Sequence, residues 1–232
     1  MSMNKMRILA VDTATTSCSV AIVDQTSLLS EFTTDREETH SKHLIDMIKA
    51  ALRMSGLNLS DLDGFAITRG PGSFTGLRIG ISTIKGLAVA SEKPVVGVSS
   101  LETLAFQMSY SRDLICPILD ARRGEVYFSR YRCINGHLIK QTKERVAPPD
   151  QAVDDLNESC LFVGNGALLY KEMILGKMGT FAFFAPMIQN TIRASTIAYL
   201  SMVKFENNDT DDIEKILPYY IRKSDAELNL VI

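Results

Sequence analysis

The chain has 232 residues, of which 46% are hydrophobic, so it is long enough for one large domain or two small ones with a substantial core. Its 25 basic and 27 acidic residues give a formal net charge of −2, and this balance disfavours a large surface that binds RNA unaided. No apolar run approaches ~18 residues, so we expect no membrane-spanning segment, and the expected compartment is the cytoplasm.

The first half of the chain predicts the order strand-strand-strand-helix-strand-helix-strand-helix. The expected strands cover residues 7–13, 19–23, 28–34, 64–69 and 95–98, and the expected helices cover residues 41–55, 76–90 and 100–110. Gly56 is the expected end of the first helix.

The second half predicts the same order again. The expected strands cover residues 114–119, 126–133, 138–145, 161–163 and 181–183, and the expected helices cover residues 150–156, 167–175 and 195–205. Asn135-Gly136 indicates a hairpin turn. The doubled order predicts an α/β protein with two ribonuclease-H-like lobes, the plan of the actin, hexokinase and Hsp70 ATPases, in the order βββαβαβα repeated twice. We expect the lobes at residues 1–111 and 112–232, the second with an extended C-terminal tail.

A glycine-rich turn, Gly70-Pro71-Gly72, stands between an expected strand and an expected helix. Ser73 or Thr75 can cap that helix, and a strand, a turn and a helix N-terminus together make an anion site. However, no Gly-Lys-Ser/Thr ending follows, as a phosphate-binding P-loop requires, and the match to a dinucleotide fingerprint is weak. The alternative is that these glycines let the helix pack closely on the sheet.

Asp12 and Asp120 each end the first strand of an expected lobe. Two carboxylates that face a cleft can bind Mg²⁺, but a carboxylate at a strand end often accepts turn N–H bonds, and we favour that interpretation. The candidate residues that face a cleft or a nucleotide are Asp12, Thr13, Arg69, Gly70, Gly72 and Asp120. Arg69, Arg78, Arg122 and Arg123 would meet phosphate there, or else they are surface or ion-paired arginines.

The sequence gives little support for a metal site or for a catalytic nucleophile. The four cysteines form no Cys-x-x-Cys pair, the chain has three histidines, and no Gly-x-Ser-x-Gly elbow is present. We therefore expect no metal, no cofactor and no protease activity.

The run from Arg69 to Gly80 resembles the signature of the bacterial TsaB (YeaZ) family. The resemblance extends over nearly the whole chain, through Ile8–Thr13, His40-Ser41, Val96–Glu102, Leu119–Tyr127, Val163–Gly166 and Pro218–Arg222. It implies a role in making threonylcarbamoyladenosine beside the anticodon of tRNA. In that reaction TsaD, the catalytic subunit, transfers threonylcarbamoyl from its adenylate to a tRNA adenosine.

The resemblance also implies that this chain does not catalyse the transfer. TsaD carries a His-x-x-x-His metal pair after the strand that corresponds to residues 95–98, and the matching positions here are Ser100 and Leu104. The implied role is a scaffold or activator that binds TsaD, with TsaE, an ATPase, as third partner. A homodimer is implied for the chain alone, and binding of tRNA is implied only for the complex.

The helix expected at residues 41–55 is apolar over an arc of roughly 220°, whereas one core-facing stripe needs about 100°. The helix expected at residues 76–90 carries only two charges, Arg78 and Lys85. These helices cover each other, or they bind a partner. The candidate partner-binding residues are Ile45, Met47, Ile48, Ala51, Met54, Leu77, Arg78, Ile81 and Lys85.

Two rival functions remain. A small ATP-dependent kinase or hydrolase with its own active site is favoured by Asp12 and Asp120 and disfavoured by the missing glycines and histidines. A module that binds tRNA directly is disfavoured by the charge balance.

Overall fold

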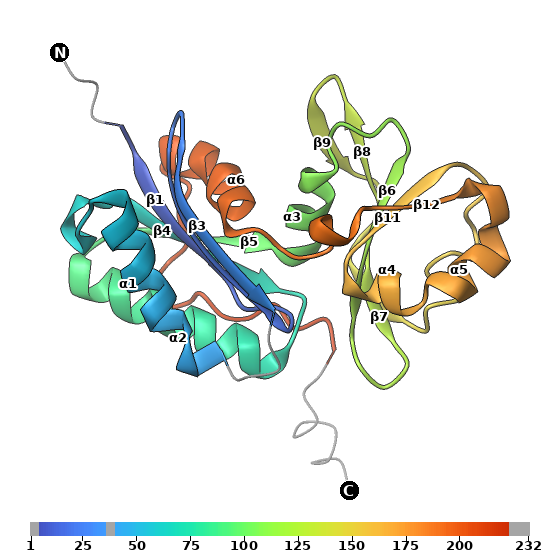
Figure 1. Cartoon of the computed structure of the whole chain (residues 1–232), viewed down its shortest axis with the longest axis horizontal. Coiled ribbons are helices and arrows are strands. Elements are labelled where there is room, and N and C mark those ends of the chain that lie inside the picture. Colours follow the sequence, from blue (N-terminus) through green and yellow to red (C-terminus); the bar gives the residue numbers. More distant parts are fainter. Residues whose placement is uncertain (1–4, 36–39, 223–232) are drawn as a thin grey trace, which may run out of the picture. The chain divides into compact units, whose positions relative to one another are not determined.

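The computed structural model describes residues 5–35 and 40–222, which form two compact units (Figure 1). Of the described residues, 5–35, 40–99 and 193–219 make up the first unit, and 100–192 and 220–222 make up the second. None of the helices in the described ranges is both long enough and apolar enough to cross a membrane.

A five-stranded sheet forms the first unit, with the strand order β3-β2-β1-β4-β5. The strands β1, β2 and β3 are antiparallel neighbours, whereas β4 and β5 run parallel to β1. Their bounds are Arg7–Asp12, Ser17–Asp24, Leu28–Asp35, Gly64–Gly70 and Val95–Ser99. β1 is buried at every residue after Arg7, which explains its nearly continuous apolar sequence.

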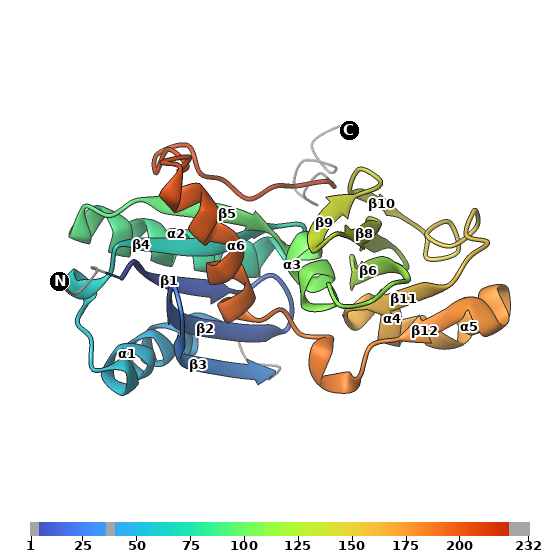
Figure 2. The same cartoon turned by 90° about the horizontal axis from the view of Figure 1, so that it is seen from above.

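Helices cover both faces of this first sheet (Figures 1 and 2). On one face, α1 (Leu44–Ser55) and α2 (Phe74–Ser91) share a core with the strands, and a short 3-10 turn, His40–Lys42, precedes α1. On the other face lies α6 (Ala194–Glu206), which packs on β1, β2 and β4. As predicted, Gly56 ends α1 in the left-handed conformation, and Ser73 caps α2 by accepting the Gly76 N–H at 3.3 Å.

The second unit repeats the same plan with an added hairpin. Its sheet has the path β10-β7-β6-β11-β12, in which β7 and β10 are antiparallel to the strand beside them and β11 and β12 are parallel to β6. The strands β6 to β12 cover Leu114–Asp120, Val126–Phe128, Tyr131–Ile134, His137–Lys140, Arg145–Ala147, Cys160–Val163 and Ala182–Phe184. The helices are α3 (Ser100–Gln107), α4 (Asn165–Leu169) and α5 (Lys171–Met178). The predicted fold of two ribonuclease-H-like lobes is confirmed.

The predicted division at residues 111 and 112 differs from the observed units. α6 follows the second unit in the chain but packs on the first sheet, whereas α3 packs on β6 of the second unit. Residues 211–219 also belong to the first unit, and residues 223–232 of the predicted tail lie outside the described ranges.

Four predicted elements of the second half are wrong. The strand expected at residues 138–145 is divided into β9 and β10, and the helix expected at residues 167–175 is divided into α4 and α5. Residues 150–156 form successive turns in place of a helix, because the Ala152 carbonyl accepts a bond from Arg130 and Leu156 bonds to Val153. The strand expected at residues 126–133 is broken where Ser129 and Arg130 bond to Thr142. At residues 150–156 the backbone N–H groups bond three residues back, as in turns, and at Arg130 the carbonyl still accepts the Gln141 N–H at 2.7 Å.

Candidate functional site

Asp12, a candidate metal ligand, lies entirely inside the first unit with no exposed surface. Its Oδ1 accepts the Thr68 hydroxyl at 2.6 Å and the Ala14 N–H at 3.2 Å. Its Oδ2 is buried and has no hydrogen-bond partner among the described residues. Burial raises the pKa of this carboxyl from 3.8 to about 7. The side chain therefore does not face an open cleft.

The turn after Asp12 lies directly against the glycine-rich turn and the start of α2. The Thr13 hydroxyl donates to the Gly76 carbonyl at 2.8 Å, and the Ser73 N–H donates to the Ala14 carbonyl at 2.7 Å. A Cβ at Gly72 would lie 2.3 Å from the Ala14 carbonyl oxygen, and one at Gly76 would lie 2.1 Å from that of Thr13. The glycines thus permit close contact between backbones, which is the second of the two alternatives.

Two of the N–H groups that an anion site at this turn would use are already bonded. That of Ser73 donates to the Ala14 carbonyl and that of Gly76 donates to the Ser73 hydroxyl. Thr13 is buried, and so is Gly70, which has a φ of +119°. Three of the predicted cleft-facing residues, Asp12, Thr13 and Gly70, are therefore structural.

Arg69, another candidate, holds a segment that returns from α6. Residues 211–219 pass β5 and the end of β4, where the Tyr219 N–H donates to the Arg69 carbonyl at 2.6 Å. Asp211 accepts the Gly97 N–H at 2.7 Å and lies 3.7 Å from the Arg69 guanidinium. This contact occupies Arg69 within the first unit.

The predicted partner-binding residues divide into a buried group and an accessible group. Four of them are in the unit's own core and cannot contact a partner in this structure, which corrects the prediction: Ile48, Ala51, Leu77 and Ile81. Met47 and Lys85 are partly buried, whereas Arg78 is exposed.

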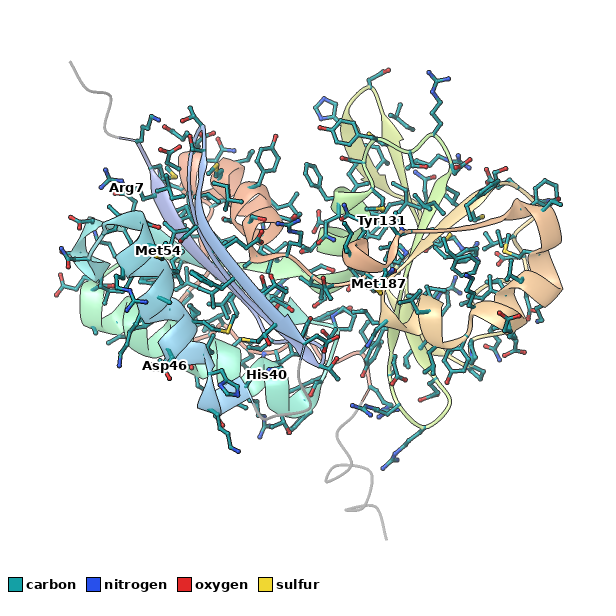
Figure 3. The ribbon with its side chains drawn as sticks, in the orientation of Figure 1. Arg7, His40, Asp46, Met54, Tyr131 and Met187 are labelled. Carbon is teal, nitrogen blue, oxygen red and sulfur yellow. The ribbon has the colours of Figure 1, made fainter. Side chains whose placement is uncertain are left out.

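The accessible apolar residues are on α1. Ile45 is 42% exposed and Met54 is 67% exposed, and Figure 3 marks Met54 and Asp46 on this helix. On α2, the Arg78 guanidinium lies 3.9 Å from the centre of the Phe74 ring, a cation–π contact that orders it. The exposed part of α1 and α2, which we call the α1–α2 face, therefore combines apolar side chains with a positioned arginine.

Asp120, in the second unit, stabilises the loop that follows β6. Its Oδ1 accepts the Arg122 N–H at 2.8 Å, and its own N–H donates to the Asn165 side chain at 3.1 Å. This is the predicted role as an acceptor of turn N–H groups. The two positions matched to metal-binding histidines, Ser100 and Leu104, are fully buried in α3. Within residues 5–35 and 40–222, no three His, Cys, Asp or Glu side chains are grouped as metal ligands.

Several residues that bond to the candidate residues were not predicted from the sequence. Thr68 had a signal, because it is a polar residue near the end of a buried strand that runs parallel to β1. Asn165 stands between two glycines, which also suggested a turn. Asp211 and Tyr219 had no local signal, since their partners are more than 100 residues away in the chain.

Comparison with known proteins identifies a family model and relatives that match most of this chain. The family model described as "TsaD: tRNA N6-adenosine threonylcarbamoyltransferase" matches residues 27–230. The tRNA threonylcarbamoyladenosine biosynthesis protein TsaB of Bacillus subtilis is 33% identical over 96% of this chain and 96% of its own length. That of Escherichia coli is 39% identical over 69% of this chain and 72% of its own length.

A solved structure agrees as well. YeaZ from Pseudomonas aeruginosa superposes with a TM-score of 0.77 and 28% identity, covering 93% of this chain and 99% of that one. The residues matched by the family model belong to both units. The chain belongs to the TsaB (YeaZ) family of tRNA threonylcarbamoyladenosine biosynthesis proteins.

Proposed function

We propose that this chain is a non-catalytic subunit that activates a TsaD-type enzyme by binding it, with the ATPase TsaE as third component. The family membership supports the reaction, which is threonylcarbamoyl transfer to a tRNA adenosine. Residues of this chain support both parts of the proposal, the absence of catalysis by the chain and its binding to the enzyme.

The first part concerns catalysis. Leu104 cannot bind a metal ion, and Asp12 is buried against Thr68 and the Ala14 amide. The catalytic metal and the phosphate contacts would therefore come from the partner. This burial also disfavours the rival ATP-dependent kinase or hydrolase.

Binding to the enzyme is supported mainly by one observation, the exposed apolar residues of α1. Ile45 and Met54 expose apolar surface on α1 although the core beneath them is complete without them. Exposed apolar residues are typical of protein interfaces, and so are ordered arginines such as Arg78 on α2. The α1–α2 face would bind the catalytic subunit, and two copies of it would pair when the chain is alone. Transfer RNA would then be bound through the assembled complex.

Reconstitution tests the proposal. The tagged chain is mixed with a TsaD-type protein and a TsaE-type protein, and modification of unmodified tRNA is measured with and without this chain. We expect co-purification and a modification rate that depends on this chain, while the chain alone releases no phosphate from ATP. Modification at the full rate without the chain, or an ATPase activity of the chain alone of about 10 per second that Asp12→Asn abolishes, would refute it.

A further inference from the structure

The chain contains the dipeptide Asn-Gly twice, and the structure places the two copies in opposite surroundings. Asn135-Gly136 forms the two-residue loop between β8 and β9. Both residues are exposed, and Figure 1 shows this hairpin projecting from the rest of the second unit. Asn165-Gly166 instead begins α4, directly after β11. Asn-Gly is chemically special, because glycine has no side chain to hinder attack by its backbone nitrogen on the preceding amide.

The turn at Asn135 has a backbone conformation close to that in which this attack occurs. The φ of Asn135 is 52° and that of Gly136 is 80°, and positive φ at both residues of a two-residue loop is typical of a type I′ turn. The related type II′ turn keeps the first residue at a φ of about +60° and has its ψ at about −120°. Only the peptide plane between the two residues has to rotate, and glycine accepts the reversed φ. The hairpin can therefore change its turn type while the strands stay paired.

That rotation brings the Gly136 nitrogen toward the Asn135 side chain. In an L-residue with a ψ of about −120°, the nitrogen of the next residue eclipses Cβ. The Gly136 nitrogen and the Asn135 Cγ are then in position to close a succinimide ring. Within residues 5–35 and 40–222, no group hydrogen-bonds to the Asn135 amide, so its carbonyl carbon is open to attack.

The second Asn-Gly is held away from this geometry. Asn165 and Gly166 have the backbone of α4, in which ψ is about −40°. The Asn165 Oδ1 accepts the Asp120 N–H at 3.1 Å. Gly166 is buried, and a Cβ there would lie 2.8 Å from the Leu119 carbonyl carbon. Because both the side chain and the peptide plane are fixed, ring closure at Asn165 requires local unfolding.

We propose that Asn135 is a site of covalent modification by spontaneous deamidation and that Asn165 is protected from it. The Gly136 nitrogen loses its proton and forms a bond to the Asn135 Cγ. The bond from Cγ to Nδ2 breaks, and the amide nitrogen takes up a proton and leaves as ammonia. Water then opens the succinimide at either carbonyl, which gives aspartate or isoaspartate. The hairpin is not part of the α1–α2 face, so this proposal does not depend on the proposed function.

Isoaspartate at this position would disturb the hairpin. It adds a carbon atom to the backbone of a two-residue loop, and the length of such a loop fixes the register of its strands. In the described sheet β9 pairs only with β8, whereas β6, β7 and β11 pair with one another. We therefore expect the modified chain to stay folded and to lose the pairing of β9.

Peptide mapping by mass spectrometry tests the proposal. The full chain is kept folded at mildly alkaline pH, and samples taken over time are digested briefly with trypsin. Cleavage after Arg132 and Lys140, and after Arg145 and Lys171, puts the two Asn-Gly pairs on separate peptides. The same chain in urea gives the rate of each site without structure. Asn135→Gly, which suits the turn and lacks the amide, is the control that should give no product in its peptide.

We expect Asn135 in the folded chain to convert at least about ten times faster than Asn165, which reacts only after local unfolding. In urea the two sites should convert at similar rates. Equal rates in the folded chain, or a faster rate at Asn165, would overturn the proposal. So would a rate at Asn135 in the folded chain below about a tenth of its rate in urea, because the turn would then protect the amide.

Hydrogen exchange of the purified isoaspartate form tests its effect on the hairpin. We expect lost protection at residues 137–140 and unchanged protection in β6 and β11. Full protection at residues 137–140 would overturn the expected loss of pairing.

Discussion

Asp12 illustrates how a single buried carboxyl links protonation to folding. Its pKa is raised from 3.8 to about 7, mainly by burial, so the folded chain binds this proton more tightly than the unfolded chain does. The stability that follows from this difference is complete below pH 3.8 and is lost as the pH rises through about 7. Over that range the loss is on the order of 4 kcal/mol.

Replacement of Asp12 by asparagine should remove this dependence. We expect the free energy of unfolding of Asp12→Asn, relative to wild type, to increase from pH 4 to pH 8, because only the wild type must bury a charge at the higher pH. Urea unfolding followed by circular dichroism at several pH values measures this difference. Parallel pH profiles for the two proteins would show that Asp12 does not titrate in this range.

Two glycines of α2 offer a matched pair of substitutions. A Cβ at Gly76 would meet the Thr13 carbonyl oxygen at 2.1 Å, whereas one at Gly86 would meet nothing within 4 Å. We expect Gly76→Ala to lower the free energy of unfolding by roughly 1–3 kcal/mol and Gly86→Ala to raise it by about 0.5–1 kcal/mol. Thermal or urea unfolding checks both. Equal effects would mean that the contact with Thr13 adjusts freely.

At the scale of elements, the α1–α2 face can be separated from the core beneath it. Ile81 is only 4% exposed and packs in the core, so its substitution by aspartate would unfold the unit and cannot report on a partner. Met47 also packs partly against the core, whereas Met54 is 67% exposed. Met54 is therefore the more informative position on α1.

We predict that Met54→Asp weakens binding to the TsaD-type subunit, and pairing of the chain with itself, by at least about tenfold while the monomer stays folded. The reason is that a charge placed in an apolar interface loses its hydration. Leu169→Asp is the control, because Leu169 is a 60% exposed apolar residue of the second unit. Size-exclusion chromatography and isothermal calorimetry measure the binding. Equal affinity of both variants would place the interface elsewhere.

Local patterns predicted most elements but not the side-chain bonds between distant residues. The three strands before α1 follow from short apolar runs and turn residues, and the ends of α1 and α2 follow from Gly56 and Ser73. The wrong helix at residues 150–156 followed Pro148-Pro149, and its sequence does not reveal that Arg130 binds the Ala152 carbonyl. The burial of Asp12 was equally hidden, because a carboxylate at a strand end fits an exposed site and a buried turn alike.

At the scale of the whole molecule, the two repeated sheets were predictable and the assignment of the helices to them was not. The sequence of α6 alone does not specify which sheet it covers. In the structure it packs on the first sheet, and polar contacts at its N-terminus hold it there. Glu31 of β3 forms an ion pair with Arg193 and accepts the Ser195 N–H at 3.0 Å, and Ser19 of β2 accepts the Ala194 N–H at 3.0 Å.

This arrangement predicts that residues 1–111 alone do not form a stable unit. Without α6 the fragment exposes the sheet face that Ile197, Met202 and Phe205 cover, and their burial contributes about 5–8 kcal/mol, comparable with the stability of a whole domain. We expect poor dispersion in its amide NMR spectrum and recovery of dispersion when residues 193–222 are expressed with it. A well-dispersed spectrum of residues 1–111 alone would contradict the prediction.

Because α6 follows the second unit in the chain but packs on the first sheet, the first sheet is covered late during synthesis on the ribosome. The contiguous body of the second unit is complete once residue 192 has emerged, whereas the first unit, although synthesised earlier, lacks α6 until residue 206 has emerged. At about 5–20 residues per second, the first sheet waits roughly 5–20 s with one face uncovered. The N-terminal half of the nascent chain is therefore the part that chaperones would have to protect, because the body of the second unit at residues 100–192 is synthesised before the first sheet is covered.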